Sequence, residues 1–413
     1  IEERGFAFVD VQLSVERDRD ASAISVTYDV GEGSRVYVER VEITGNVRTL
    51  DRVIRRNIRV VEGDAFNAAK IRRSRQLIEN LGFFASIDIK NRPGSAADRR
   101  VLNIDVKEKS TGELSFGAGF SSDVGALATA GIRERNLLGR GQDLKIDFSL
   151  SGINQDIVVG FTEPYFLNRD VSAGFDVFDT SRNFIESSFE RDRLGFGLHL
   201  GYSLTEYLAQ EIRYGLSAED LRAFAGASPS IAAQQGEFVV SSVGQTLGYN
   251  RLDRRLNPSD GYFYRLSNDL AGLGGDREWL RTKIEAGQYE PFWDGWVVSL
   301  LGEVGYIAGL GSQDVKISDR WFLGGRAFRG FKVAGVGPRD ISNNNALGGN
   351  FLYKATTELA FPFGLPKELG IKARVFSVAG SLQDVDEDNF GNLGDTGSLR
   401  ASLGFGISWD SPF

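Results

Sequence analysis

The sequence of 413 residues lacks cysteine entirely and contains a single histidine, His199. Without cysteine, a disulfide framework, a thiol nucleophile and a thiolate metal site are all excluded. The sequence also lacks the G-x-x-x-x-G-K-[ST], H-E-x-x-H and G-x-S-x-G motifs of nucleotide-binding proteins, zinc proteases and serine hydrolases. We therefore expect no catalytic residues, no metal site and no other cofactor, and we interpret the chain as a protein that is not an enzyme.

Long apolar runs are missing as well, so no segment has the roughly 20 apolar residues of a transmembrane helix. Basic charge is scarce beyond residue 110. Of the 48 basic and 56 acidic residues, 20 and 18 lie in residues 1–110, which leaves 28 and 38, a balance of −10, for the rest. Because binding to nucleic acid needs a basic surface, we expect no nucleic-acid partner there.

Residues 34–109 are predicted to form one α+β domain in the order strand, helix, helix, strand, strand. The second helix should begin after Asn67, a residue type that caps helix N-termini, and should end before Gly82. Residues 1–33 hold two further runs in which apolar and polar residues alternate. Two strands alone have only marginal stability as an independent unit. We interpret them as the C-terminal part of a preceding domain.

Seven arginines lie on the two predicted helices and form either a solvated face or a docking surface for an acidic partner. They are Arg52, Arg55, Arg56, Arg59, Arg72, Arg73 and Arg75.

From about residue 113 onward, apolar side chains alternate with glycine, serine and charged residues. The run 399–410 shows the pattern well, since every second residue is apolar and the others are Arg, Ser, Gly or Asp. Strands with one apolar face and one solvated face are typical of a transmembrane β-barrel. A charge at mid-membrane on the lipid-facing side costs ~2–4 kcal/mol. We therefore predict an all-β antiparallel transmembrane barrel over residues 110–413.

Fourteen such strands can be counted, and the connections between them differ in length. The connections after even-numbered strands are short, as at 164–168 and 291–293, whereas 220–235, 310–348 and 382–397 follow odd-numbered strands. Short periplasmic turns and long extracellular loops are typical of outer-membrane barrels. The predicted strands are 112–121, 125–136, 141–151, 155–163, 169–179, 187–202, 205–219, 236–250, 260–272, 277–290, 294–309, 349–362, 369–381 and 398–410.

The longest connection, 310–348, carries too many large apolar residues for a solvated loop. Trp321, Phe328 and Phe331 are among them, and Arg329 lies between the two phenylalanines. A buried guanidinium needs a carboxylate partner. We therefore predict that this loop folds inward against a cavity wall that carries an acidic group.

Together these segments resemble the BamA family of outer-membrane proteins, which joins polypeptide-transport-associated (POTRA) domains to a barrel. Four motifs carry the resemblance: the junction 110–119, the turn 162–166, the turn with Asp253, Pro258 and Gly261, and the loop motif Phe328-Arg329-Gly330-Phe331. The resemblance implies that residues 1–33 end the fourth POTRA domain and that residues 34–109 are the fifth. It also implies that Arg329 reaches Glu358 on the inner wall.

Two departures from the family pattern matter. The family's second acidic position, in an F-x-D-x-G segment, is occupied here by Val378, so Arg329 is expected to have one carboxylate partner and the loop to be held less firmly. The family barrel has sixteen strands, so the last two are expected to be missing here. Either the chain is truncated or its sequence lacks them.

The resemblance implies a place in the outer membrane of a Gram-negative bacterium, with the POTRA domain in the periplasm. The implied function is assembly and insertion of other β-barrels by β-augmentation at a weak barrel seam. The implied partners are the lipid bilayer, unfolded outer-membrane barrel substrates and lipoprotein subunits that bind the POTRA domain.

The first strand contains Gly112, Gly117 and Gly119, which either weaken the seam or fit the strand to a curved barrel.

The alternative function is a protein translocation pore of the two-partner-secretion or TamA type. A general porin would carry no N-terminal domain.

Two further features are interpreted without a chemical role. His199 alternates with glycines and is expected to line the lumen. The acidic run 384–389 lacks the spacing, the glycine and the terminal glutamate of a calcium-binding loop, so we expect a solvated extracellular loop.

Overall fold

The computed structural model describes residues 9–18, 23–32, 35–254, 256–365, 369–386, 393–395 and 397–409. These residues form two compact units. The first comprises Ile1–Glu113 with Arg133–Leu144, and the second comprises Leu114–Ile132 with Lys145–Phe413. The predicted domain limits at residues 33 and 109 stay predictions.

The first unit contains a three-stranded sheet with two helices, in the order that the sequence predicted. Strand β5 lies between β3, to which it is parallel, and β4, to which it is antiparallel. Asn67 caps α2 by accepting a hydrogen bond from the backbone N–H of Lys70. The elements are β3 (Tyr37–Thr44), α1 (Asp51–Arg55), α2 (Ala68–Asn80), β4 (Phe84–Pro93) and β5 (Arg99–Glu108).

A core of aliphatic and phenylalanine side chains holds the helices on the sheet. Ile54 from α1, Ile78 from α2 and Ile104 from β5 are all fully buried in it. A separate antiparallel pair, β1 (Val9–Asp18) with β2 (Ala23–Glu32), precedes this domain in the chain.

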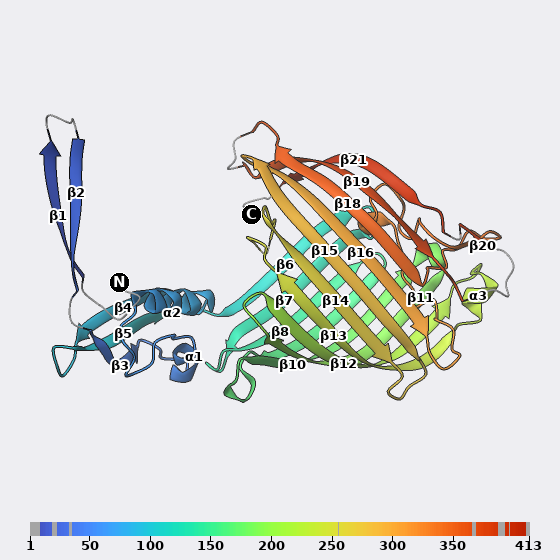
Figure 1. Ribbon diagram of the computed structural model, residues 1–413. Coiled ribbons are helices and arrows are strands. Elements are labelled where there is room, and N and C mark those ends of the chain that lie inside the picture. The colour runs from blue at the N-terminus through green and yellow to red at the C-terminus, as the bar shows by residue number, and fades with distance from the viewer. Residues whose placement is uncertain are drawn as a thin grey trace. The chain divides into compact units, whose positions relative to one another are not determined.

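The second unit is built on one antiparallel sheet of fourteen strands, which curves along its length (Figure 1). All fourteen predicted strands are present, and each strand pairs with its neighbours in the chain. The strands are β6 (Gly112–Ser121), β7 (Gly125–Leu137), β8 (Gln142–Ser151), β9 (Asn154–Glu163), β10 (Val171–Phe184), β11 (Phe189–Ser203), β12 (Leu208–Ala223), β13 (Gly236–Asn250), β14 (Gly261–Ala271), β15 (Trp279–Trp293), β16 (Trp296–Gly309), β18 (Phe351–Pro362), β19 (Ile371–Gln383) and β21 (Arg400–Trp409).

Side chains on the two faces of this sheet differ as the alternation predicted. On β21, Leu403, Phe405 and Ile407 are 80%, 87% and 62% exposed, whereas the residues between them are partly covered. Such an apolar outer face suits lipid, and the small residues on the other face leave room inside. No helix among the described residues combines the length and the apolar character that crossing a bilayer requires.

Short elements complete the second unit. They are the helical turns η2 (Phe166–Asn168), η3 (Ile185–Ser187) and η4 (Gly325–Ala327), the helix α3 (Pro229–Ala232), and the strand pair β17 (Arg339–Asp340) with β20 (Leu393–Gly394).

Candidate functional site

The long connection between β16 and β18 folds into a compact loop. The segment 324–335 closes on itself, since the backbone N–H of Gly325 donates to the carbonyl of Lys332 at 3.0 Å and that of Gly335 to the same carbonyl at 2.9 Å. Gly330 sits at the tip with φ +95°, and a Cβ there would press against the side chain of Ser402 on β21. A glycine therefore lets the tip approach the sheet closely.

An apolar cluster anchors this loop to the sheet. Phe328 is completely buried and meets the ring of Phe331 edge-on, with 5.2 Å between ring centroids. Three buried aliphatic side chains, Leu352 on β18 and Val378 and Leu382 on β19, form the floor of the cluster. Burial of one such aromatic ring contributes roughly 2–3 kcal/mol, so the loop has a substantial hydrophobic anchor.

An ionic contact lies next to the apolar cluster. The guanidinium of Arg329 donates to Oε2 of Glu358 at 2.7 Å, so the structure brings the predicted pair together. Arg374 on β19 donates to the other oxygen, Oε1, at 2.5 Å. The Arg329 guanidinium also lies over the Phe376 ring, 3.7 Å from its centroid, and Ser402 donates to the Arg329 carbonyl at 2.5 Å.

Three of these contacts were missed by sequence reasoning, namely those of Arg374, Phe376 and Ser402. Glu358 is the direct cross-strand partner of Phe376, and Arg374 is the diagonal neighbour. Diagonal neighbours in a sheet lie within reach of long side chains. The loop motif therefore identifies Arg329, but its contacts with Arg374 and Phe376 can be found only from the register in which β18 pairs with β19.

The place of the family's second carboxylate is filled with apolar packing. Val378 is 2% exposed and belongs to the cluster around Phe328. Arg329 thus has one carboxylate, which it shares with Arg374, together with the face of an aromatic ring. A cation over an aromatic face gains ~0.5–2 kcal/mol, which partly replaces the absent acid.

The buried position of Val378 reverses the expectation that an acid there would tighten the loop. Val378→Asp should place a carboxylate in an apolar cluster, which costs several kcal/mol when no partner is reached. We expect faster proteinase K cleavage of residues 324–336 in this variant than in the parent, and in Val378→Ala a smaller increase. Slower cleavage of Val378→Asp would show that the new carboxylate reaches Arg329.

A lumenal ladder of charges continues from this contact. Glu303 on β16 pairs with Lys283 at 2.9 Å and with Lys354 at 2.7 Å.

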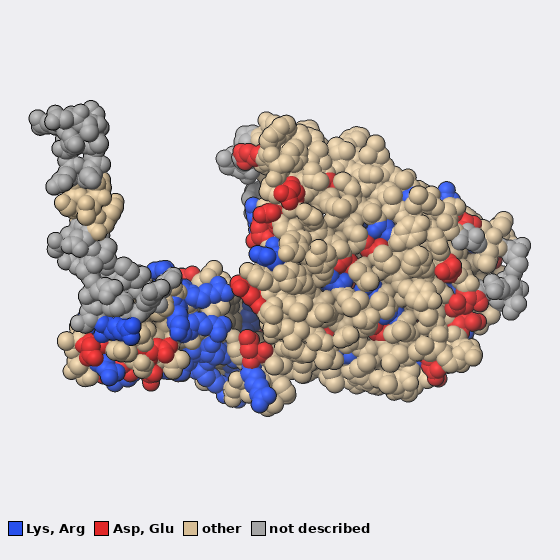
Figure 2. All heavy atoms as spheres, in the orientation of Figure 1, with Lys and Arg blue, Asp and Glu red and all other residues tan. Residues whose placement is uncertain are grey.

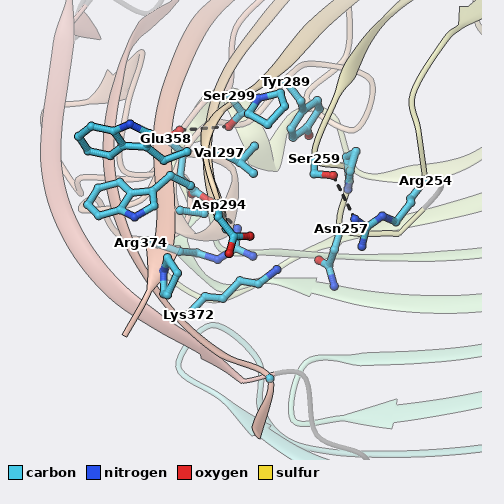
Figure 3. A pocket seen from close by; sticks show the side chains of 18 of the residues that line it. Arg254, Asn257, Ser259, Tyr289, Asp294, Val297, Ser299, Glu358, Lys372 and Arg374 are labelled. Atoms are coloured by element: carbon cyan, nitrogen blue, oxygen red, sulfur yellow. Dashed lines mark hydrogen bonds and ion pairs between the residues drawn. The ribbon is translucent and has the colours of Figure 1, made fainter. Parts of the chain in front are cut away.

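Glu358 also lines a cavity of about 640 Å³. Figure 3 shows Glu358, Arg374 and Lys372 on one wall of this cavity, facing Arg254 and Asn257 across it.

The base of the loop is held by further polar contacts. Arg320, 5% exposed, donates to the carbonyls of Val315 and Leu347, at 3.0 and 3.2 Å from its Nε and Nη1 atoms. Asp386 accepts hydrogen bonds from the backbone N–H of Val315 at 2.7 Å and from Asn350 at 2.8 Å.

Asp384 and Asp386 of the acidic run are exposed, as expected for a solvated loop, and the carboxylate of Asp386 also accepts from backbone and amide donors of the loop base. Residues 387–389 of that run lie outside the described residues.

The turn between β13 and β14 is organised by Asp253. Its carboxylate accepts from the backbone N–H groups of Ser259 and Asp260 at 2.9 and 3.1 Å and from the Ser259 hydroxyl at 2.6 Å. Gly261 has φ +101°, and a Cβ there would collide with the carbonyl of Arg251. The spacing of the turn motif thus has a direct physical cause, although its role in function stays a prediction.

Hydrogen bonds from Ser259, followed by that from Asp260, hold the pKa of Asp253 well below its usual range. When the pKa of an aspartate is lower in the folded state, its ionised form stabilises the fold at pH above the pKa of the unfolded state, which is near 4. This stabilisation is lost as the pH falls through the pKa of the folded state. Asp253→Asn should therefore remove the acid-dependent part of the stability of this turn. Hydrogen exchange of residues 251–262 at pH 7 and pH 3 would check this, since the parent should lose protection on acidification and the variant should change less.

The glycines of the first strand lie on β6, an end strand of the fourteen-stranded sheet. A Cβ at Gly117 would press on the hydroxyl of Thr129, and one at Gly119 would touch Leu127 at an ordinary distance. Gly117 is thus explained by close packing on β7, whereas a role in a weak seam stays a prediction for all three glycines.

Among the described residues, no group of three or more metal-ligating side chains comes together. His199 contacts the hydroxyl of Thr162 at 3.2 Å and the carboxylate of Asp176 at 3.3 Å. These polar neighbours suit the predicted lumenal position.

Comparisons with known proteins match the whole chain. Residues 136–413 match the model described as the Omp85 superfamily domain, and residues 36–109 match the POTRA model described as a surface antigen variable number repeat. An outer membrane protein assembly factor BamA from Neorickettsia risticii is 33% identical over the full chain, and the chain spans 56% of that relative's length.

Two solved structures share the fold. The crystal structure of BamA from Haemophilus ducreyi lacking POTRA domains 1–3 gives a TM-score of 0.82 at 24% identity, over all of this chain and 85% of the other. CdiB from Acinetobacter baumannii gives a TM-score of 0.54 at 13% identity, over 97% of this chain and 72% of the other.

Proposed function

Because this chain belongs to the Omp85 superfamily, we propose that it is the membrane-embedded part of a factor that assembles and inserts other β-barrels into the outer membrane. The resemblance to BamA is confirmed by the relatives and by the shared fold. The chain is thus a protein of the Gram-negative outer membrane whose POTRA domain lies in the periplasm. The observation that carries the proposed function is the 33% identity to an assembly factor across the full chain.

The proposed work is non-covalent and needs no catalytic group. A nascent membrane strand carries backbone N–H and C=O groups that cannot enter lipid unpaired, because each would cost several kcal/mol. A sheet edge in the membrane can pair those groups before the substrate closes into its own barrel. In this proposal the glycine-rich β6 provides the edge, and the POTRA domain receives the substrate or lipoprotein subunits.

The loop motif has a supporting role in the same proposal. Arg329 and Phe328 fix the loop against the inner wall of the sheet through Glu358 and the apolar cluster. A fixed loop would keep the lumen filled, so that the sheet can loosen at one edge without collapsing. Loop closure is therefore proposed as a condition for assembly activity.

A protein translocation pore of the two-partner-secretion or TamA type is the second candidate, and the chain shares its fold with CdiB at 13% identity. Its likeness is weaker than that of BamA, with TM-scores of 0.54 and 0.82. The two functions predict different conductance, because a translocation pore should pass ions steadily in planar bilayers, whereas a lumen closed by the loop should pass little.

Reconstitution tests the proposed function. The full-length protein is placed in liposomes with an unfolded outer-membrane barrel, and folding is followed by heat-modifiable gel migration. We expect faster folding than in empty liposomes and a loss of that acceleration when residues 310–348 are deleted. Equal folding with and without the protein, together with steady conductance, would transfer the assignment to a translocation pore.

A further inference from the structure

One cavity of the second compact unit has no part in the proposed assembly function. It has a volume of about 640 Å³ and is lined by residues of β15, β16, β18 and β19 and of the connections after β13, β15 and β18. In the antiparallel sheet these three connections lie at the same end as the start of β6, which follows the POTRA domain in the chain. We call this space, which Glu358, Lys372 and Arg374 line, the periplasmic cavity.

Cationic side chains outnumber anionic ones among the described residues that line the periplasmic cavity. The cations are Arg254, Arg329, Lys372 and Arg374, and the acids are Asp294 and Glu358. Both oxygens of Glu358 are occupied, since Oε2 accepts from Arg329 and Oε1 accepts from Arg374. Arg374 also donates through Nε to Ser408 at 3.0 Å, and among the described residues its Nη2 atom has no acceptor. One carboxylate therefore serves two guanidinium groups, which leaves this wall with excess positive charge.

Lys372 adds a second cation to the same wall. It lies two positions before Arg374 on β19, so both side chains project from one face of the sheet. Phe376 and Val378 continue this row and pack against the long loop, which identifies the face as the inner one. No described residue forms a hydrogen bond or an ion pair with the Lys372 ammonium group. Figure 3 shows this side chain reaching into the cavity toward Arg254.

The cation on the opposite side of the cavity is balanced within its own turn. Arg254 pairs with the carboxylate of Asp253 at 3.3 Å and donates to the hydroxyl of Ser259 at 3.2 Å. Its charge therefore needs no further partner. The place where an anion is missing is the wall formed by Lys372 and Arg374.

An apolar surface adjoins these two cations. In the pairing of β18 with β19, Pro362 lies directly opposite Lys372, and Ala360 lies directly opposite Arg374. Val297 on β16 is in turn the direct partner of Ala360. Because direct partners in a sheet share a face, the three apolar side chains lie beside the cations on the inner wall. A ligand that matches this surface combines an anionic group with a short apolar body.

The size of the cavity and the position of its charges suit a small molecule. Ligand sites of proteins commonly have volumes of roughly 300–1,000 Å³, and the periplasmic cavity lies within this range. Figure 2 shows few charged side chains along the strands in that view, apart from the two ends of the sheet. The cations of the cavity are thus not part of a generally basic surface. Charges of one sign in a concave site attract an oppositely charged ligand more strongly than charges spread over an open surface.

We propose that the periplasmic cavity binds a small organic anion. Its carboxylate or phosphate group lies between Lys372 and Arg374 and accepts charge-assisted hydrogen bonds from both. Its apolar body lies against Val297, Ala360 and Pro362. The site therefore selects against inorganic anions, which have no apolar body, and against neutral molecules of the same shape, which cannot balance the charge of Lys372.

The test is ligand-observed fluorine NMR with the full chain in phosphatidylcholine nanodiscs. The probes are para-fluorophenylpropanoate and para-fluorophenyl phosphate, and the primary amide of the first is a neutral control with the same body. Acetate and inorganic phosphate are added as competitors. Lys372→Gln removes the cation that has no partner among the described residues. Arg265→Gln makes the same charge change on β14, where Arg265 pairs with Glu285 and does not line the cavity.

We expect one of the two anionic probes to bind the parent about tenfold more tightly than the amide, and the tighter of them identifies the preferred anionic group. Lys372→Gln should weaken that probe about tenfold, because a charge-assisted hydrogen bond is lost, and Arg265→Gln should leave it unchanged. Equal binding of acid and amide would overturn the proposal, since it would indicate simple partition into lipid.

Three further results would also overturn it. Displacement of the probe by acetate or inorganic phosphate as effectively as by the unlabelled probe would indicate an adventitious anion only. An equal loss in Lys372→Gln and Arg265→Gln would indicate a general effect of charge in the lumen. Absence of binding to the parent would show that the cations of the cavity are only solvated.

Discussion

Phe328→Ala is expected to detach the long loop from the inner wall of the sheet. The ring is completely buried in the cluster with Leu352, Val378 and Leu382. Removing a buried phenylalanine side chain costs ~3–5 kcal/mol, because the lost burial is combined with an unfilled cavity. That loss falls on a single loop, so the loop should open locally while the strands remain paired.

Hydrogen exchange and proteinase K cleavage of residues 324–336 would report this opening, and assembly of a barrel substrate would report its effect on function. Phe148→Ala is a matched control, since Phe148 lies on β8 and is 39% exposed. Phe328→Leu should retain most of the protection. Unchanged exchange in Phe328→Ala would contradict an anchoring role for this ring.

Glu358→Ala is expected to loosen the loop more than Arg329→Ala does. Glu358 accepts from both Arg329 and Arg374, so its removal leaves two neighbouring guanidinium groups without their carboxylate. Breaking a buried pair costs ~3–5 kcal/mol, and because the Arg329 side chain is 36% exposed we expect roughly 2–3 kcal/mol. In Arg329→Ala, by contrast, Glu358 keeps Arg374 and the change should be nearer 1 kcal/mol.

The two variants are compared by hydrogen exchange of the loop, and by a protease that does not cut at arginine, because Arg329→Ala removes a tryptic site. Arg374→Ala provides the control, since it leaves the pair of Arg329 with Glu358 intact. An equal effect of Glu358→Ala and Arg329→Ala would show that Arg374 does not share the carboxylate in solution.

Much of this fold is readable from the sequence because one physical rule governs each membrane strand. A charge on the lipid face is costly, so alternation marks all fourteen strands and their inward faces. In the first unit, Asn67 and Gly82 mark the ends of α2 for equally local reasons, one as a hydrogen-bond acceptor and the other through its φ of +73°. Helix ends of this kind can be predicted from residue types alone, without knowledge of tertiary contacts.

The companions of Arg329 could not be predicted in the same way. Arg374 reaches Glu358 only because β19 pairs with β18 in one particular register, which the connecting residues do not reveal. Asp386, although exposed as the acidic run predicted, accepts from the backbone N–H of Val315 across 71 positions of sequence, and the run itself does not reveal that contact. Ser402, on β21, touches the loop tip through a contact that depends on how the loop folds.

The loop is held by two anchors of opposite character, the apolar cluster around Phe328 and the carboxylate of Glu358. Simple salts screen charge pairs and leave apolar contacts largely intact, whereas sulfate strengthens apolar burial by its exclusion from protein surfaces. Because the Glu358 side chain is only 12% exposed and buried pairs are screened much less than exposed ones, sodium chloride should weaken the ionic anchor only modestly. Ammonium sulfate should in addition reinforce the apolar anchor. The choice of salt, rather than its ionic strength, would then decide how firmly the lumen is closed during purification and crystallisation.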